Sequence, residues 1–206
     1  AIEQSSAHLE NNINIVRWNI DKIYLQDLAQ QGVILVPTLW QQRLGNQALI
    51  RENIAQYFAE LNCQQLVIKP RISANADNTF WLKPGEIAEK LPPINQAFTE
   101  RDFMVQPFME SIINEGEYSL FYFNGQYSHA ILKTPKNNDF RVQEEHGGRL
   151  TTIEPEAKLV EQANQCLSAI AKQHQMPLYA RVDFVRFGEQ FALMEAELIE
   201  PSLYFN

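Results

Sequence analysis

The sequence predicts an α+β protein whose sheets are antiparallel. Two pairs of segments alternate apolar and polar residues with period two, and short turns join them at 188–190 and at Asn124-Gly125. Two longer segments, 46–61 and 154–171, instead carry apolar residues at helical spacing. The first pattern predicts hairpins, and the second predicts amphipathic helices that pack on a sheet.

Length and composition fit a globular protein that has either one domain with two lobes or two small domains. The chain has 206 residues, 45% of them hydrophobic, so it can bury a proper core. Its net charge of -8 argues against non-specific binding to nucleic acid or to an anionic membrane. No run approaches the ~18 apolar residues of a membrane span, and no signal peptide is evident. We expect a cytoplasmic protein with Cys63 and Cys166 as reduced core cysteines.

The first 38 residues predict a connector, a helix and a short strand. Residues 1–17 are polar and weakly patterned, which is typical of a connector. A helix is expected from Asn19, as its N-cap, to Gly32, as its stop. Lys22 falls in its first turn, where a cation opposes the helix dipole; this favours a function slightly, although a solvated lysine is the simpler alternative. The apolar segment 33–38 predicts a strand.

The apolar strand expected at 66–70 carries a lysine near its end. Lys69 must either extend to solvent or meet an anion, because burying an unpaired lysine is unfavourable. The simpler alternative is a lysine that emerges at a strand end. Further elements expected here are a strand at 79–82, a brief helix at 86–90, a strand at 103–106 and a candidate hinge at 107–109.

The register of the last hairpin follows from its connection. If 188–190 form a three-residue loop, Phe187 faces Phe191. Counting back along both strands then places four charged side chains on one face, in the opposed pairs Asp183–Glu195 and Arg181–Glu197.

These opposed carboxylates predict a cation. Like charges directly opposite each other destabilise a sheet, and apolar neighbours make ionised carboxylates costly. A few hard oxygen ligands suit Mg²⁺, which is held by one or two carboxylates together with substrate phosphates and water. The alternative is a solvated hairpin edge, on which Arg181 neutralises one acid.

The same acids resemble the metal-binding end of the ATP-grasp superfamily. The resemblance rests on Asp183, on the segment Glu195 to Glu197 and on the following Glu200-Pro201-Ser202. In that superfamily an Asp and a Glu-x-Asn or Glu-x-Glu pair hold two Mg²⁺ ions on the ATP phosphates. The resemblance implies ATP and two Mg²⁺ ions, or Mn²⁺ in their place, with three metal ligands: Asp183, Glu195 and Glu197. Glu197 stands where glutathione synthetase-like members commonly have Asn.

Motifs in the first half also match this family, in the same order. Asp21-Lys22 and Val36-Pro37-Thr38 resemble the run that opens the ATP-binding lobe, in which the lysine contacts phosphates. Lys69 matches the lysine that holds the α and β phosphates, and the loop 71–78 matches the lid above them. That loop has Ser73, Ala74 and Ala76 where most relatives have glycines. The adenine is implied to bind at the hinge: Gln106, Pro107, Phe108 and Met109.

The second half supplies the implied ribose and catalytic groups. The E-G-E-x-S segment resembles the one whose acid binds the ribose hydroxyls, a role that either Glu115 or Glu117 could fill. Asp139-Phe140-Arg141, with the glycines at 147–148, resembles a loop whose arginine reaches the transferred phosphate or the substrate carboxylate. The implied catalytic set is Arg141, Lys133 and Arg181.

The resemblance implies an ATP-grasp fold, in which two α+β lobes with antiparallel sheets grip ATP between them. We expect a connector and first helix at 1–32, a smaller lobe at 33–106 and a larger lobe with the metal site at 107–206. Family members usually carry a further N-terminal domain that shapes the substrate pocket, and the chain is expected to begin after it.

The implied activity is that of an ATP-dependent carboxylate-amine ligase. Such an enzyme forms an acyl phosphate and releases ADP and phosphate, with small-molecule carboxylate and amine substrates and no nucleic-acid or membrane partner. A homodimer or a homotetramer is expected. The alternatives are a nucleotide-binding regulatory or interaction module without ligase activity, favoured by the unusual 71–78 loop, and a plain α+β scaffold.

Overall fold

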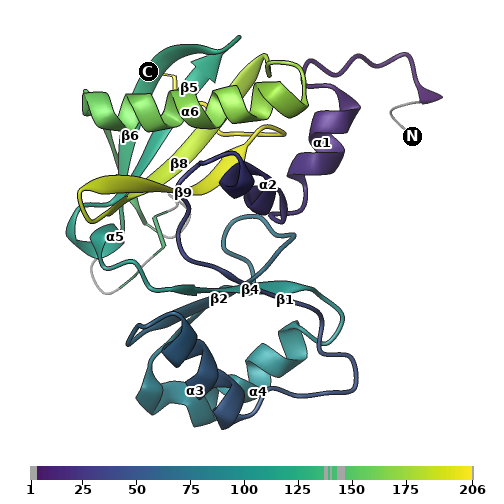
Figure 1. Cartoon of the computed structure of the whole chain (residues 1–206), viewed down its shortest axis with the longest axis vertical. Helices are drawn as coiled ribbons and strands as arrows, with labels where there is room; N and C mark the ends of the chain where they lie inside the picture. Colours follow the sequence, from purple (N-terminus) through teal and green to yellow (C-terminus); the bar gives the residue numbers. More distant parts are fainter. Residues whose placement is uncertain (1–3, 137–138, 140, 143–146, 206) are drawn as a thin grey trace. The chain divides into compact units, whose positions relative to one another are not determined.

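The chain divides into two compact units. The computed structural model describes residues 4–136, 139, 141–142 and 147–205. The larger unit comprises Ala1–Leu35 and Ser111–Asn206, and the smaller unit comprises Val36–Glu110. Each unit is built on an antiparallel sheet (Figure 1), which confirms the predicted α+β class.

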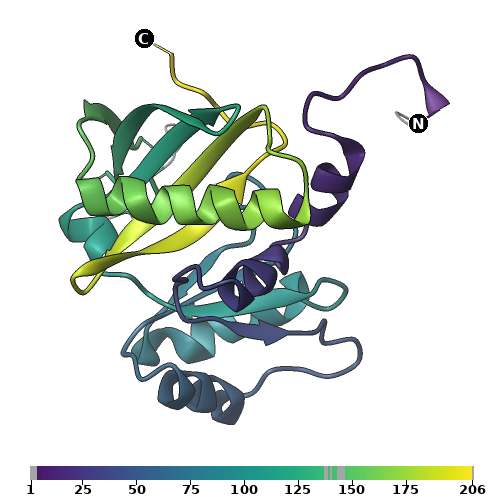
Figure 2. The same ribbon diagram turned by 45° about the horizontal axis from the view of Figure 1, so that its top comes forward.

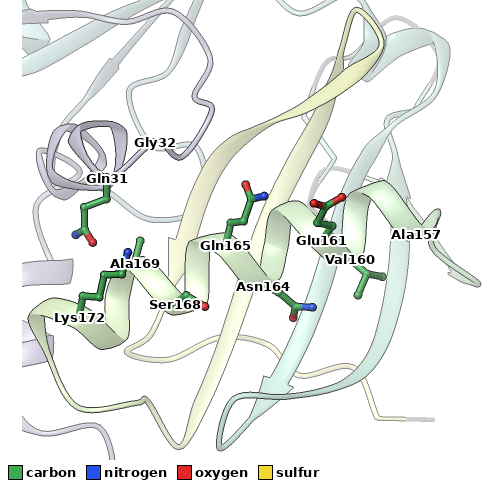
Figure 3. A pocket seen from close by; sticks show the side chains of 10 residues that line it. All are labelled: Gln31, Gly32, Ala157, Val160, Glu161, Asn164, Gln165, Ser168, Ala169 and Lys172. Atoms are coloured by element: carbon green, nitrogen blue, oxygen red, sulfur yellow. The ribbon is translucent and has the colours of Figure 1, made fainter.

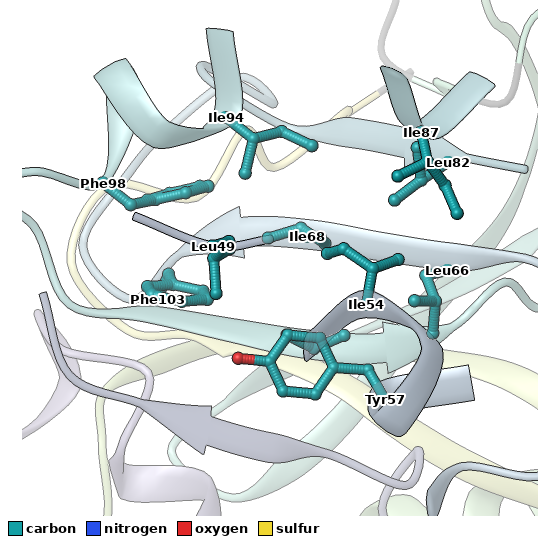
Figure 4. Packing of buried hydrophobic residues seen from close by; sticks show 11 residues of the cluster. Leu49, Ile54, Tyr57, Leu66, Ile68, Leu82, Ile87, Ile94, Phe98 and Phe103 are labelled. Atoms are coloured by element: carbon teal, nitrogen blue, oxygen red, sulfur yellow. The ribbon is translucent and has the colours of Figure 1, made fainter. Parts of the chain in front are cut away.

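The smaller unit has a four-stranded sheet in the order β1-β4-β2-β3. Its strands are β1 (Leu39–Gln41), β2 (Leu66–Pro70), β3 (Phe80–Leu82) and β4 (Phe103–Pro107). Its helices are α3 (Arg51–Glu60), the 3-10 turn η2 (Pro84–Glu86) and α4 (Ile87–Ala97). Helices α3 and α4 lie on one face of the sheet (Figure 1), and their apolar side chains meet those of the strands in the core that Figure 4 shows.

Strand β2 has one buried face and one partly exposed face. Leu66, Ile68 and Pro70 are buried, whereas Val67 and Lys69 are only partly buried. Since successive side chains of a strand point to opposite faces, Lys69 lies on the face away from the apolar core. The predicted strand at 66–70 is confirmed, and the sequence pattern correctly sets Lys69 apart from its apolar neighbours.

The larger unit has a five-stranded sheet in the order β7-β6-β5-β8-β9. Its strands are β5 (Glu117–Phe123), β6 (Gln126–Thr134), β7 (Arg149–Ile153), β8 (Tyr179–Phe187) and β9 (Gln190–Glu197). Its helices are α1 (Ile13–Asn19), α2 (Tyr24–Gln30), α5 (Ser111–Asn114) and α6 (Ala157–Gln173). Helix α6 crosses one face of the sheet (Figures 1 and 2) and buries its apolar stripe there.

The hairpin of β5 and β6 has the predicted two-residue turn. Phe123 pairs with Gln126, and Asn124 and Gly125 have φ angles of 48° and 73°. Two successive positive φ angles are typical of the type I′ turn that Asn-Gly favours.

The hairpin of β8 and β9 has the predicted acid pairs but not the predicted loop. The loop is Gly188-Glu189, so Phe187 pairs with Gln190 rather than with Phe191. A bulge then leaves Met194 without a partner, and this extra residue restores the pairing of Asp183 with Glu195. The error in loop length and the unforeseen bulge cancel, so the predicted register of the acids is confirmed.

Three predictions for the first 38 residues are wrong. Helix α1 lies within the supposed connector, and its N-cap is Asn12, whose side chain accepts from two backbone N–H groups. Asn19 is the last residue of α1 rather than an N-cap, because its buried side chain bonds to the end of β9. The apolar segment 33–38 forms no strand, only an isolated bridge between Leu35 and Leu193.

Other boundaries differ more modestly. Helix α3 begins five residues later than expected, and α4 continues well past residue 90 with Pro92 and Pro93 inside it. Cys63 and Cys166 are free cysteines, as predicted. Within the part of the chain that the structure describes, no helix has both the length and the apolar character needed to cross a membrane.

We predict that Gly116→Ala destabilises the larger unit. Gly116 has a φ of +119°, and a Cβ atom there would lie 2.6 Å from the Lys133 carbonyl oxygen. Backbone strain of this kind costs about 1–3 kcal/mol. Urea unfolding should show this loss, whereas Gly85→Ala, which meets nothing within 4 Å, should change stability by less than about 0.5 kcal/mol. Equal effects of the two substitutions would contradict this account of Gly116.

Candidate functional site

Charged side chains from separate parts of the chain meet on one face of the larger sheet. Cross-strand pairs share a face, and the pairs here are Glu117 with Lys133, Ser119 with Asp183, Asp183 with Glu195, and Arg181 with Glu197. Lys22 joins them from the turn between α1 and α2. We call this group the charged face: Lys22, Glu117, Ser119, Lys133, Arg181, Asp183, Glu195 and Glu197.

Asp183 lies at the centre of the charged face and is 3% exposed. Its Oδ2 atom is 3.1 Å from an Arg181 terminal nitrogen, and its Oδ1 atom is 3.4 Å from Lys133 Nζ. The Ser119 hydroxyl also donates to Oδ1. Burial alone would raise the pKa of Asp183, but the Arg181 and Lys133 charges outweigh it and hold the pKa at about 2.

Lys133 links two acids of the charged face. Its Nζ atom lies 2.8 Å from Glu117 Oε1 as well as close to Asp183. Burial would lower the pKa of Lys133, yet the charges of Asp183 and Glu117 raise it above its usual value. Lys133 is therefore a buried, permanently charged lysine at the junction of β5, β6 and β8.

The like-charged pair predicted from the sequence is compensated by cations of the protein itself. Glu195 lies opposite Asp183, and its Oε1 atom is 3.0 Å from Lys22 Nζ. Lys22 is 7% exposed and precedes α2 rather than lying in the first turn of a helix. The alternative of simply solvated acids therefore does not describe Asp183, whereas Glu195 remains partly exposed.

Glu197 is a partly buried acid of the charged face. It forms an ion pair with Arg181 through its buried Oε2 atom. Burial is the main cause that raises the pKa of Glu197 to about 7, against the lowering effect of the Arg181 charge. Four carboxylates on this face are matched by three cations, so a further positive charge would be favourable here.

The acids fit Mg²⁺ as partial ligands. Their oxygens are hard donors, and the four carboxylates of this face outnumber its three cations. No three His, Cys, Asp or Glu side chains of the described residues are arranged as a ready metal-binding group. A divalent ion would therefore need other oxygens in addition, and phosphate and water oxygens are the usual ones.

Two residues predicted for the site make their described contacts with residues outside the charged face. Glu115 accepts from Tyr118 at 3.0 Å and pairs with Arg186 at 2.7 Å, whereas Glu117 pairs with Lys133. Of the two acids that the sequence left open, only Glu117 belongs to the charged face. Arg141 makes its described contacts with Asp139, at 2.8 Å for the ion pair; Phe140 lies outside the described residues.

The predicted base-binding residues lie in the smaller unit. Gln106 is buried and donates to the Thr38 hydroxyl at 2.9 Å, and Pro107 ends β4 just before Met109. The Phe108 ring stacks on Trp81 with centroids 4.4 Å apart, and the Phe108 N–H donates to the Gln65 carbonyl. The segment thus combines the end of strand β4 with the stacked rings of Phe108 and Trp81.

Sequence reasoning missed Ser119 and Trp81. Ser119 follows Glu117 by two residues in the same strand, a spacing that places both side chains on one face. Trp81 is opposite Val67, two residues before Lys69, so strand pairing would have placed it on the Lys69 face. Both could have been found from the register of the predicted strands.

A groove elsewhere in the larger unit contains none of the predicted site residues. It has a volume of about 550 Å³ and lies between the end of α2 and the outer face of α6 (Figure 3). Its walls carry amide and hydroxyl side chains, including Gln31, Gln165 and Ser168, with no concentration of charge. We consider the charged face the stronger candidate because interacting ionisable groups, three of them buried, converge there and not among the residues that line the groove.

Comparisons with known proteins find relatives by sequence and by fold. No protein-family model matches the chain. The cycloserine biosynthesis protein DcsG of Streptomyces lavendulae is 28% identical over 197 residues, which are 92% of this chain and 64% of that protein. The crystal structure of D-cycloserine synthetase DcsG matches with a TM-score of 0.83 and 25% identity, covering 96% of this chain and 68% of that one.

Two more distant structures share the fold. D-alanine–D-alanine ligase from Bacillus anthracis, complexed with ATP, matches with a TM-score of 0.66 and 18% identity over 92% of this chain and 58% of its own. ATP-grasp ligase PsnB, complexed with a phosphomimetic precursor variant, Mg and ADP, gives 0.66 and 15%, with 98% and 57% covered. The chain thus spans less than two thirds of the curated relative and of these two ligases.

We predict that Glu197 makes the metal-free protein less stable as the pH rises from 4.5 to about 7. A folded pKa above the usual one means that the folded state holds the proton more tightly, so this contribution is complete at low pH and is lost through that window. Glu197→Gln should remove up to about 3 kcal/mol of the pH dependence. Urea unfolding in EDTA across this range measures the effect, with the exposed Glu189→Gln as control. A stability difference that is constant with pH would contradict the raised pKa.

Proposed function

Because the chain is a member of the ATP-grasp superfamily, we propose that it forms the ATP-binding part of a carboxylate-amine ligase. The observation that carries the proposal is the charged face, where four carboxylates and three cations converge on one sheet. Surface ion pairs contribute little to stability, and buried ones are often less stabilising than apolar packing. This concentration of charges, three of them buried and four half-buried, is therefore more readily explained by the binding of a charged substrate.

We assign the nucleotide base and the first phosphates to the smaller unit. The stacked Trp81 and Phe108 rings offer an apolar surface to adenine, and Lys69 offers a charge to the phosphates. Pro107 lacks an N–H, and the N–H of Phe108 is already bonded to Gln65. The backbone bonds to adenine therefore fall to Gln106 and Met109, which flank these two residues.

We assign the terminal phosphates and the ribose to the larger unit. Asp183, Glu195 and Glu197 would hold Mg²⁺, which when bound neutralises the phosphate oxygens. Lys22 and Lys133 bring positive charges, and Arg181 presents a planar fork suited to oxyanions. Glu117, rather than Glu115, is placed to accept from the ribose hydroxyls, since only Glu117 belongs to the charged face.

The proposed reaction has two steps. A substrate carboxylate oxygen attacks the γ-phosphorus of ATP, the bond to the ADP oxygen breaks, and an acyl phosphate forms. An amine then attacks the acyl carbon, phosphate leaves with the bonding electron pair, and the amine loses a proton. Lys133, Arg181 and Arg141 would stabilise the charge that develops on the transferred group, mainly by position and electrostatics.

The substrates are proposed to be small molecules. The similar proteins include a D-cycloserine synthetase and a D-alanine–D-alanine ligase. Both names fit a substrate of amino-acid size that carries a carboxylate or an amine. We propose the division expected from the sequence, with a smaller nucleotide lobe, a larger metal-binding lobe and a further substrate domain in the whole protein.

Binding of ATP with Mg²⁺ should stabilise the protein more than ATP with EDTA. A ligand at 100 times its Kd adds about 2.7 kcal/mol, enough for a clear rise in melting temperature. Glu195→Gln should reduce the Mg²⁺-dependent part of the rise, whereas Glu189→Gln at the exposed hairpin turn should leave it unchanged. Equal shifts with Mg²⁺ and with EDTA in the unsubstituted protein would defeat the metal assignment.

Turnover should yield ADP and phosphate. The whole protein, with its proposed substrate domain, is combined with ATP, Mg²⁺ and a panel of amino acids, and hydroxylamine is added to trap an acyl phosphate as a hydroxamate. Arg141→Ala should lower trapping about a hundredfold, as expected for loss of a donor to the transition state. Cleavage of ATP to AMP and pyrophosphate would refute the ligase proposal, and Mg²⁺-dependent ATP binding without any product would favour the regulatory module.

A further inference from the structure

Strand β9 is an edge strand whose free side is occupied by side chains rather than by another strand. It pairs with β8 on one side only. On the other side, the N–H and C=O of Phe191 bond to the Gln162 side chain, and the N–H of Leu193 bonds to the Ile34 carbonyl. Such groups on an edge strand would otherwise be open to water or to another chain.

Towards its end, β9 is held by the segment that carries Lys22. The Tyr24 hydroxyl accepts from the Ala196 N–H at 2.7 Å and donates to the Ala196 carbonyl at 3.0 Å. Asn19 donates to the same carbonyl at 2.7 Å and accepts from the Leu198 N–H at 3.0 Å. Tyr24 and Asn19 thus make the contacts that a neighbouring strand would make.

These contacts are buried and specific. Tyr24 is 1% exposed and Asn19 is 7% exposed, so water does not replace their bonds. Asn11 extends the same arrangement, since its amide donates to the Leu198 carbonyl at 2.7 Å. Three polar side chains, from Asn19, Tyr24 and the preceding Asn11, therefore fix the backbone at Ala196, near the end of β9, and at Leu198, just beyond it.

The fixed residues alternate with the acids of the charged face. Ala196 lies between Glu195 and Glu197, and the backbone of Ala196 determines the direction in which both acids leave the strand. Lys22, which lies between Asn19 and Tyr24 in sequence, meets Glu195 at 3.0 Å. One segment thus both orients the two acids and supplies a cation to one of them.

We propose that Tyr24 and Asn19 are positioning residues that orient Glu195 and Glu197 towards a divalent cation on ATP. The proposal rests on the proposed function of the charged face. A displacement of about 1 Å in a catalytic group can lower a rate about a hundredfold, so the placement of these acids is a functional requirement. Residues that only closed the sheet edge would affect stability without affecting the cation.

Tyr24→Phe tests the proposal, because it removes only the hydroxyl that binds Ala196. The readout is Mn²⁺ binding in the presence of ADP, followed by calorimetry or by electron paramagnetic resonance. The control is Tyr179→Phe, which removes a hydroxyl that donates at 2.8 Å to the Ile199 carbonyl, beyond the acids. We expect at least tenfold weaker Mn²⁺ binding for Tyr24→Phe and less than a twofold change for Tyr179→Phe.

Amide hydrogen exchange provides a second measurement. Tyr24→Phe should speed the exchange of the Ala196 amide and leave the Phe191 amide, held by Gln162, unchanged. Faster exchange at Ala196 with unchanged Mn²⁺ affinity would overturn the proposal, because the contact would then be structural only. An unsubstituted protein that binds no Mn²⁺ with ADP would refute the proposed function as well, which separates the two failures.

Discussion

The burial of the Asp183 charge is the constraint on which the larger unit depends. An ionised carboxylate that is almost fully buried is stable only if cations and hydrogen-bond donors surround it, and Arg181, Lys133 and Ser119 supply these. Each of them reaches Asp183 only in the observed strand register. The close approach of Gly116 to the Lys133 backbone belongs to the same requirement, since it brings the start of β5 against the end of β6.

The sequence was most informative where charged residues occur within strands that alternate with period two. The opposition of Asp183 and Glu195 and the position of Lys69 at the end of β2 could both be predicted, since charged residues stand out in apolar strands. The bulge at Met194 could not, because one extra residue leaves the alternation intact on each side of it. The bulge also means that Leu193 and Glu195 point to opposite faces, although simple alternation would have put them on the same face.

The interactions that were missed involve side chains bonded to backbone. Asn is a residue type that often caps helices. The sequence does not show whether the Asn19 side chain bonds to nearby backbone or, as observed, to the backbone of Leu198, nearly 180 residues away. Glu115 and Glu117 were equally suitable by type, and only the registers of β5 and β6 separate them. The segment 33–38 is apolar enough for a strand, yet only Leu35 bridges to β9. The positions of these residues depend on contacts with residues that are distant in the sequence, which a local sequence pattern does not identify.

The closed edge of β9 has a consequence for association between molecules. A strand from a second copy, or from an aggregating chain, adds to a sheet by bonding to unpaired N–H and C=O groups. At Phe191, Leu193, Ala196 and Leu198 those groups already have partners within the chain. The opposite edge is β7, a short strand with mainly exposed, polar residues. A strand from another molecule would therefore add at β7, the opposite edge of the sheet from Glu195 and Glu197.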